Sequence, residues 1–144
     1  MAQTVAQQHT IDAGLSTQLV FDSAGTHVRQ AGQKPDARAV TSLVARGYRS
    51  PRTRSRNVAM HDFDEFDLIL AMDSKNLADL RQQCPSTCGH KLRLFAAFMY
   101  GKLDAEVPDP YFGNAQGFDR VLDLCEAASE GLIQHLRTRS TDTA

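Results

Sequence analysis

Asp67-Leu-Ile-Leu-Ala-Met72 is a run in which every residue after the aspartate is apolar. Its length suits a β-strand. A strand that is apolar on both faces is typical of a parallel sheet covered by helices on each side, because neither face then meets water. Asp73 can cap a helix that continues to about Gln83, and Pro85 prevents its continuation. The stretch therefore predicts a buried strand followed by a helix.

The segments on either side continue this alternation. Helices are expected over residues 1–13, from Pro35 to about Gly47 and from about Gln116 to Arg137, and strands over Gln18–Phe21 and Lys91–Phe95. Strands and helices joined by short connections predict an α/β domain, with a small doubly wound, mostly parallel sheet and helices on both faces. We expect one domain over residues 1–137 and a flexible tail over 138–144.

The composition narrows the class of protein. The chain has 144 residues, 42% of them hydrophobic and 23% charged, with a net charge of −1. These values are those of a single soluble domain and give no general attraction to nucleic acid or membranes. No apolar run reaches the ~18–20 residues of a membrane span, and the N-terminus lacks a secretory signal. Three cysteines, an odd number, argue against a disulfide framework. We expect a cytoplasmic monomer with reduced thiols.

The alternation opens on a helix, without a preceding strand. In doubly wound sheets the first strand is usually central, and ligands bind beside the loop that leaves its carboxyl end. We expect both to lie upstream of Met1. Without that strand, Leu19–Phe21 and Leu68–Met72 would each lose a neighbour in the sheet.

Three stretches occur in an order and spacing that resemble a known family. They are Asp22-Ser-Ala-Gly-Thr26 followed by Gly32-Gln-Lys-Pro-Asp-Ala-Arg38, then Asp62–Asn76, and finally Val107-Pro-Asp-Pro-Tyr-Phe-Gly113. Together they are similar to the bacterial low-molecular-weight protein tyrosine phosphatases from residue 1 to about 137. The resemblance implies the phosphotyrosine phosphatase I-like fold and hydrolysis of phosphotyrosine through a phosphocysteine, without metal or cofactor. It implies a phosphotyrosine protein as substrate, such as a bacterial tyrosine kinase or a polysaccharide-export protein.

One family motif does not occur in the 144 residues. The family opens with an apolar strand and a Cys-x(5)-Arg-Ser-Pro phosphate-binding loop, whereas the residues six positions after Cys84, Cys88 and Cys125 are His, Leu and Gly. A nucleophilic thiolate needs a positive field from backbone N–H groups, an arginine and a helix N-terminus. The helix over residues 1–13 supplies only the last of these. We expect the chain to be truncated before this helix and inactive as given.

The resemblance assigns roles to the last motif. Asp109 corresponds to the general acid, which protonates the leaving tyrosine oxygen and later activates water. Tyr111 and Phe112 correspond to the aromatic wall of the phosphotyrosine slot. From the residues alone, Asp109-Pro110 is more simply an ordinary turn, and the two aromatic rings could cover the edges of a core, Phe112 more readily than Tyr111.

Three further positions have two readings each. Ser23 corresponds to a serine that supports the phosphate loop, or is an ordinary serine at a strand end. Asp73 helps to organise the site, or is only a helix cap. Arg29 stands where many members have Trp, Tyr or His at the substrate mouth. It would favour acidic residues around the phosphotyrosine, or is only a solvated charge.

Other activities remain as alternatives. The chain could be a catalytically dead binding or scaffold protein on the same fold. The pair Cys84 and Cys88 resembles the redox cysteines of arsenate reductases built on this fold, which makes arsenate reduction a minor alternative. The same pair with His90 is half of a zinc site, but no second pair stands at a suitable spacing, so no metal is expected. The loop Arg49–Arg56 has four arginines without interleaved aromatic residues, which favours a solvated loop that steers anionic substrate over a nucleic-acid site.

Overall fold

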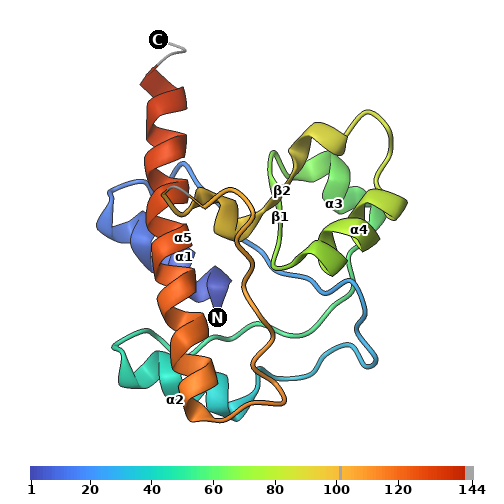
Figure 1. Cartoon of the computed structure of the whole chain (residues 1–144). Coiled ribbons are helices and arrows are strands. Elements are labelled where there is room, and N and C mark those ends of the chain that lie inside the picture. Colours follow the sequence, from blue (N-terminus) through green and yellow to red (C-terminus); the bar gives the residue numbers. More distant parts are fainter. Residues whose placement is uncertain (101, 142–144) are drawn as a thin grey trace.

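The centre of the molecule is a β-α-β unit. The computed structural model describes residues 1–100 and 102–141, the last three by their backbone alone. Strand β1, Ile69–Ala71, pairs in parallel with β2, Leu92–Leu94, so that Ile69 faces Leu92. Helix α4, Ser74–Gln83, and the 3-10 helix η1, Gly89–Lys91, connect them. The strands lie between α1 and α5 on one side and α3 and α4 on the other (Figure 1).

The predicted apolar strand packs against a hydrophobic cluster on each face, as expected for a covered parallel sheet. Successive side chains of a strand point to opposite faces. Leu68, Leu70 and Met72 pack against the larger core, and Ile69 and Ala71 belong to a second core. The unbroken apolar run is thus explained, because each face of β1 meets a different hydrophobic cluster.

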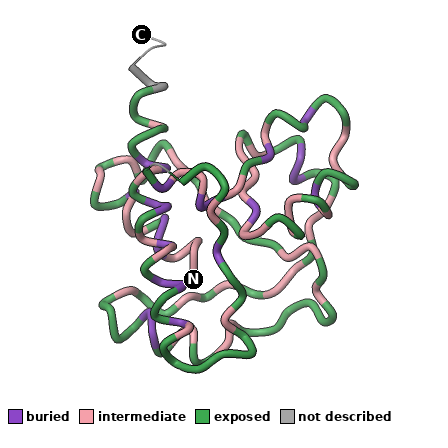
Figure 2. The backbone as a smooth tube through the Cα atoms, viewed as in Figure 1, coloured by how far each residue is buried: buried purple, intermediate pink, exposed green. Residues whose placement is uncertain are grey.

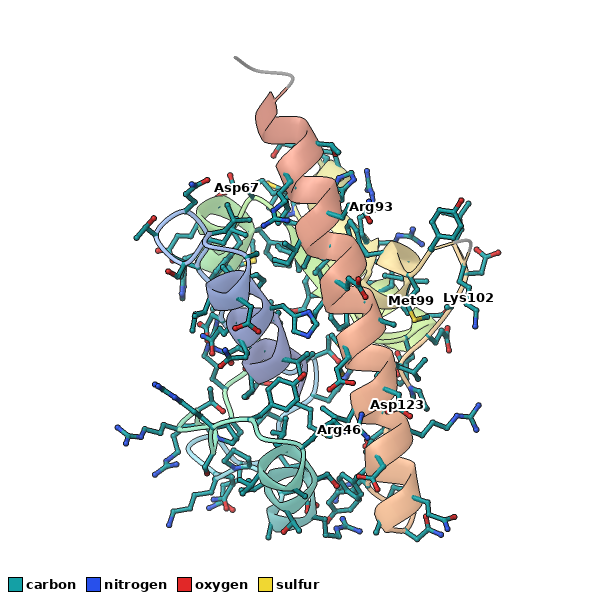
Figure 3. The ribbon with its side chains drawn as sticks, turned by 90° about the vertical axis from the view of Figure 1, so that its left-hand side faces the viewer. Arg46, Asp67, Arg93, Met99, Lys102 and Asp123 are labelled. Atoms are coloured by element: carbon teal, nitrogen blue, oxygen red, sulfur yellow. The ribbon has the colours of Figure 1, made fainter. Side chains whose placement is uncertain are left out.

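The larger core joins three helices and a 3-10 helix. These are α1, Ala2–Asp12; α2, Ala37–Ala45; η2, Phe95–Phe98; and α5, Ala115–Thr141. The side chains buried there include Val5, Leu43, Phe95, Leu122 and Leu132. The buried positions recur along the side of α5 that faces α1 (Figure 2). Arg46, which ends α2, pairs with Asp123 and, at 3.1 Å, with Glu126 of α5 (Figure 3).

Helix α5 also approaches η2 closely at a glycine. A Cβ atom added to Gly131 would lie 1.8 Å from the carbonyl oxygen of Phe98 and 2.8 Å from its carbonyl carbon. Both distances are far shorter than a van der Waals contact. The contact therefore requires a residue without a side chain at position 131.

Two predicted segments differ from the structure. The strand expected over Gln18–Phe21 does not form, and Val20 is 85% exposed. An extended segment becomes a strand only if its backbone forms hydrogen bonds with a neighbouring strand. Within residues 1–100 and 102–141, no strand pairs with Gln18–Phe21. The last helix, expected to end at Arg137, continues as α5 to Thr141. Residues 142–144 lie outside the described part.

Helix α3, Met60–Glu65, was not expected from the sequence and is fixed by a buried carboxylate. Asp62, which is 5% exposed, accepts a hydrogen bond from the backbone N–H of Ala59 at 2.8 Å. It also accepts two bonds from the Arg56 guanidinium, at 2.8 and 3.0 Å. The bonds from Arg56 are the main cause that lowers the pKa of Asp62, and the carboxylate raises the pKa of Arg56 in turn. Asp62 thus joins α3 to the preceding loop.

Asp62→Asn should destabilise the protein by about 1–3 kcal/mol near pH 7, because it weakens three bonds to a buried charged group. The pKa of Asp62 is lower in the folded protein than in the unfolded chain. The stability that its carboxylate contributes is therefore complete above the unfolded-state pKa of about 4, and it is lost as the pH falls through the folded-state pKa. Urea unfolding at pH 7 and at pH 3 should show the difference between wild type and variant shrinking at acid pH.

Asp64→Asn is the matched control for this prediction. Asp64 lies on the same helix and is exposed, so the charge change is the same without the buried bonds. Equal losses in the two variants at pH 7 would contradict the role given to Asp62.

No helix of the described residues has both the length and the apolar character needed to cross a membrane.

Candidate functional site

The loop that carries Asp109 is attached to the carboxyl end of β1. The backbone N–H of Val107 donates to the carbonyl of Met72 at 2.8 Å, and Val107 is buried. One residue earlier, Glu106 accepts bonds from the backbone N–H of Ser74, at 2.8 Å, and from its hydroxyl. These bonds lower the pKa of Glu106. Asp109, two residues after Val107, therefore lies at the edge of the sheet where α/β proteins bind ligands.

Asp109 and the residues that follow form a tight turn with an exposed aromatic pair. An Asp109 carboxylate oxygen accepts from the backbone N–H of Tyr111 at 3.0 Å, and Gly113 N–H donates to the Pro110 carbonyl at 2.8 Å. The rings of Tyr111 and Phe112 meet edge to face, 5.1 Å apart. Tyr111 is 57% and Phe112 96% exposed, so neither covers the edge of a core. The turn presents one carboxyl group beside two accessible rings.

Arg38, in the first turn of α2, holds this turn through a contact that the sequence did not predict. Its guanidinium donates to the Tyr111 carbonyl at 3.0 Å and lies 5.4 Å from the centre of the Tyr111 ring and 4.8 Å from that of Phe118. Two bonds to Asp36 hold the guanidinium in place, lower the pKa of Asp36 and raise that of Arg38. Arg38 ends the stretch Gly32–Arg38, one of the motifs on which the family resemblance rests, but the sequence alone did not show which residue it contacts.

Ser23 lies against the first turn of α1. Its hydroxyl donates to the side-chain carbonyl of Gln3 at 2.6 Å, and the amide of Gln3 donates to the Phe21 carbonyl at 3.1 Å. The N-terminus of a helix has free backbone N–H groups and a positive dipole end, which together attract anions. Ser23 is thus placed beside the element that the sequence predicted to supply a positive field.

Asp73 is a helix cap in this structure. Its carboxylate accepts from the backbone N–H of Asn76 at 2.7 Å, which satisfies the start of α4. The Asn76 amide also donates to the Thr26 hydroxyl at 3.2 Å. The cap is therefore connected to the segment that carries Ser23. Among the described residues, no hydrogen bond joins Asp109 directly to Ser23 or Asp73.

Arg29 is exposed, and within the described part of the chain no hydrogen bond or ion pair fixes its guanidinium. The loop around it is nevertheless ordered, since the backbone N–H of Val28 donates to the Asn57 side chain at 2.8 Å. The structure brings Asp109, Tyr111 and Phe112 together and leaves Arg29 outside this group of contacts.

None of the three thiols has the surroundings of a nucleophile. Cys125 is 1% exposed, and burial raises its pKa to about 11. Cys88 is also buried. Cys84 is partly exposed, but burial, followed by the neighbouring Cys88, raises its pKa. A nucleophilic cysteine needs the opposite shift. No group of three His, Cys, Asp or Glu residues among those described could hold a metal ion.

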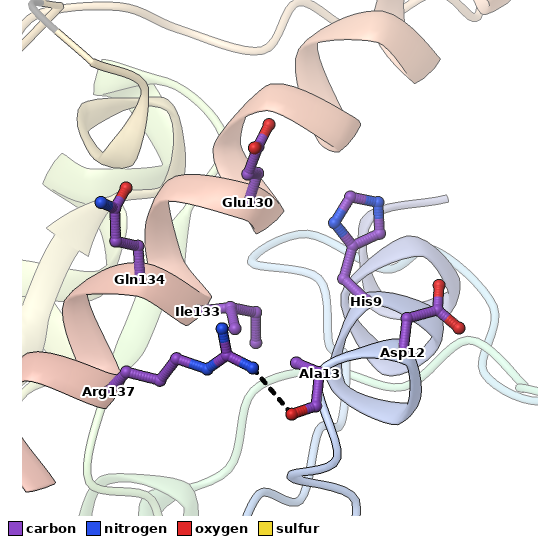
Figure 4. Close-up of a pocket in the computed structure, with 7 residues that line it drawn as sticks. All are labelled: His9, Asp12, Ala13, Glu130, Ile133, Gln134 and Arg137. Carbon is purple, nitrogen blue, oxygen red and sulfur yellow. Dashed lines mark hydrogen bonds between the residues drawn. The ribbon is translucent and has the colours of Figure 1, made fainter.

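The surface of the described residues is hollowed in at least two places. One, of about 480 Å³, lies between the C-terminal end of α1 and α5 (Figure 4). Its charges are mixed, with Arg137 against Asp12 and Glu130, and Arg137 donates to the Ala13 carbonyl at 2.8 Å. None of the predicted site residues lines it. The second hollow, of about 280 Å³, has Ser23 in its wall.

The fold and the site together define the chain as an α/β protein of the doubly wound class, with candidate ligand-binding groups at the carboxyl end of a parallel strand.

Comparison with known proteins gives the family. A sequence model of the low molecular weight phosphotyrosine protein phosphatases matches residues 1–141. A Synechocystis sp. protein named as a low molecular weight protein-tyrosine-phosphatase is 40% identical over 136 residues, which are 94% of this chain and 86% of that protein. The crystal structure of a protein tyrosine phosphatase from Entamoeba histolytica superposes with a TM-score of 0.91 and 36% identity, covering 96% of this chain and 88% of that one. The crystal structure of a Vibrio cholerae low molecular weight phosphotyrosine phosphatase superposes with a TM-score of 0.88 and 32% identity, covering 96% of this chain and 88% of that one.

The chain belongs to the low molecular weight phosphotyrosine protein phosphatase family. The family resemblance and the α/β fold predicted from the sequence are thereby confirmed.

Proposed function

We propose that this chain is part of a protein tyrosine phosphatase in which Asp109 is the general acid and Tyr111 and Phe112 flank the substrate ring. The observation that carries the proposal is the Asp109 turn. It sets one carboxyl group beside two exposed aromatic rings, on a loop bonded to the carboxyl end of β1. Aromatic side chains pack well against a phenyl ring in edge or offset contacts.

The proposed reaction has two steps. A cysteine thiolate attacks phosphorus, an S–P bond forms, and the bond from phosphorus to the tyrosine oxygen breaks while Asp109 gives its proton to that oxygen. Water then attacks the phosphocysteine, and the Asp109 carboxylate takes its proton as the S–P bond breaks. Phosphate and the thiolate are released, so atoms and charges balance over the cycle.

The nucleophile in this scheme is not one of the three thiols of residues 1–144. The buried Cys125, with its pKa raised to about 11, and the buried Cys88 support this view. The 144 residues contain no Cys-x(5)-Arg pattern. We therefore propose that residues 1–144 alone are inactive and that activity requires a loop of that pattern placed before α1, whose N-terminus would face the phosphate.

A second candidate is a binding or scaffold protein that holds phosphotyrosine without cleaving it. The same lack of an activated thiol favours it. Arsenate reduction is less well supported, because it would use Cys84 and Cys88 as exchanging thiols and Cys88 is only 7% exposed.

The proposal includes a cellular setting. We infer a cytoplasmic monomer that acts on a phosphotyrosine protein, such as a bacterial tyrosine kinase or a polysaccharide-export protein, without metal or cofactor. The free cysteines support a reducing compartment such as the cytoplasm. The net charge of −1 gives no general attraction to a membrane surface or to nucleic acid.

Turnover of p-nitrophenyl phosphate tests the proposal. Residues 1–144 should give no turnover above buffer. The same chain extended at its N-terminus by an apolar strand and a Cys-x(5)-Arg-Ser-Pro loop should release phosphate with saturable kinetics. Serine in place of the cysteine of that loop should abolish the release, because the hydroxyl is a far weaker nucleophile at neutral pH.

Two results would contradict the proposal in different ways. Saturable turnover by residues 1–144 that is lost in Cys84→Ser or Cys88→Ser would place the nucleophile within the chain. An extended protein that folds and binds phosphotyrosine but releases no phosphate would favour the scaffold candidate.

A further inference from the structure

The hollow of about 280 Å³ beside Ser23 combines small side chains with basic ones. Ser23, Gly25 and Val28 contribute to its lining, together with the cations of Lys34, Arg54 and Arg56. No aromatic residue lines it. Stacking of a nucleic-acid base is therefore not the interaction that this cavity offers. Its volume lies just below the range of small-molecule pockets, so it suits a single side chain better than a cofactor.

The walls of the cavity are held by backbone bonds. The segment around Ser55 lies between the segment around Gly25 and the segment that contains Gly32 and Gln33. On one side Gly25 N–H donates to the Arg56 carbonyl at 2.9 Å, and on the other Gly32 N–H donates to the Ser55 carbonyl at 2.8 Å. Ser55 N–H in turn donates to the Gln33 carbonyl at 3.0 Å. The Arg49–Arg56 loop is thus not a free solvated loop along its whole length.

The Ser55 hydroxyl completes this arrangement. It accepts from the backbone N–H of Gln33 at 2.9 Å and donates to the Gln30 carbonyl at 2.9 Å. A cavity whose walls are already bonded to one another binds a ligand at a smaller entropic cost than a flexible loop does.

The three cations of the cavity are not equivalent. Arg56 is compensated, because it pairs with Asp22 at 2.8 Å and with Asp62. Lys34 and Arg54 are exposed, and among the described residues no acidic side chain pairs with either of them. The cavity therefore offers two unbalanced positive charges to an anion.

The cavity adjoins the candidate active site. Ser23 contacts the first turn of α1 and also lines the cavity. Lys34 is two residues from Asp36, so their Cα atoms lie within about 7 Å. Asp36 in turn holds Arg38, which donates to the Tyr111 carbonyl. A peptide bound beside Tyr111 could therefore extend a neighbouring side chain toward Lys34.

We propose that the Lys34/Arg54 cavity binds the carboxylate of an acidic residue that flanks the phosphotyrosine of the substrate. The placement beside a phosphotyrosine rests on the proposed function, whereas the binding of a carboxylate does not. Exposed ion pairs of this kind contribute modestly, so two of them give a preference of about fivefold rather than an absolute requirement.

Fluorescence anisotropy with labelled peptides tests the proposal on the 144-residue chain. One peptide has glutamate on both sides of phosphotyrosine, a second has glutamine there, and a third has glutamate around unphosphorylated tyrosine. The glutamate phosphopeptide should bind about fivefold more tightly than the glutamine one, and 0.5 M salt should reduce this preference. In Lys34→Gln/Arg54→Gln the two phosphopeptides should bind equally.

Arg49→Gln/Arg52→Gln is the matched control, since both arginines lie in the same loop but do not line the cavity. It removes the same charge and should keep the preference. Loss of the preference in both double variants, or its absence from the wild type, would overturn the proposal. If glutamate favours binding equally around phosphorylated and unphosphorylated tyrosine, the carboxylate site stands and its placement beside a phosphotyrosine is wrong. The proposed function is tested separately, by turnover of the extended chain.

Discussion

Asp109→Asn should lower kcat/KM for phenyl phosphate by about 10²–10⁴-fold in the phosphatase extended by its nucleophilic loop, because the variant cannot protonate the leaving oxygen. The loss should be smaller for p-nitrophenyl phosphate, whose leaving group is stable without a proton. Steady-state kinetics with both substrates measures these effects.

Asp104→Asn is the matched control for the general acid. Asp104 is an exposed carboxylate in the same connection between η2 and α5, and it should tolerate the change. If Asp109→Asn has an unchanged rate, or loses the same factor with both substrates, then Asp109 is not the proton donor.

Gly131→Ala should destabilise the protein by about 3 kcal/mol, which for a chain of this size lowers Tm by roughly 10 °C. The new methyl group would lie 1.8 Å from the Phe98 carbonyl oxygen. That oxygen belongs to the backbone, so α5 and η2 must move apart as whole elements. Their separation would loosen the core around Phe95 and Leu132. Thermal unfolding followed by circular dichroism measures the change.

Gly117→Ala provides the control on the same helix. The nearest atoms to a Cβ at Gly117 are 3.8 and 4.0 Å away, an ordinary contact. Because alanine has the higher helix propensity, this substitution should stabilise the protein by up to about 1 kcal/mol. An unchanged Tm in Gly131→Ala would show that the two elements tolerate a wider spacing than the structure indicates.

The elements that could be predicted from sequence have their causes within a few residues of the chain. The apolar run before Met72 predicted β1, Asp73 predicted the start of α4, and the apolar face of α5 predicted the last helix. The expected strand at Gln18–Phe21 depends instead on a partner far along the chain, which local composition cannot supply. Helix α3 was missed because its cap, Asp62, lies inside the helix and is fixed by an arginine of the preceding loop.

The same distinction applies to the candidate site. Asp109, Tyr111 and Phe112 lie within four residues of one another, so the sequence motif alone predicted that they form one group. The structure adds the turn at Asp109 and the edge-to-face contact of the two rings. The contribution of Arg38 could not be predicted, because its partner Tyr111 lies 73 residues away. The roles of Ser23 and Arg29 stay predictions. Asp73 caps α4, and its part in organising the site also stays a prediction.

The division of β1 between two hydrophobic clusters also protects the register of the sheet. A slip by one residue would turn Leu70 or Met72 toward α4, into space occupied by the small side chain of Ala71, which is only 2% exposed. The same slip would leave the larger core underfilled. Mispaired arrangements of this strand are therefore penalised on both faces at once, which widens the energy gap that separates the native fold from its nearest competitors.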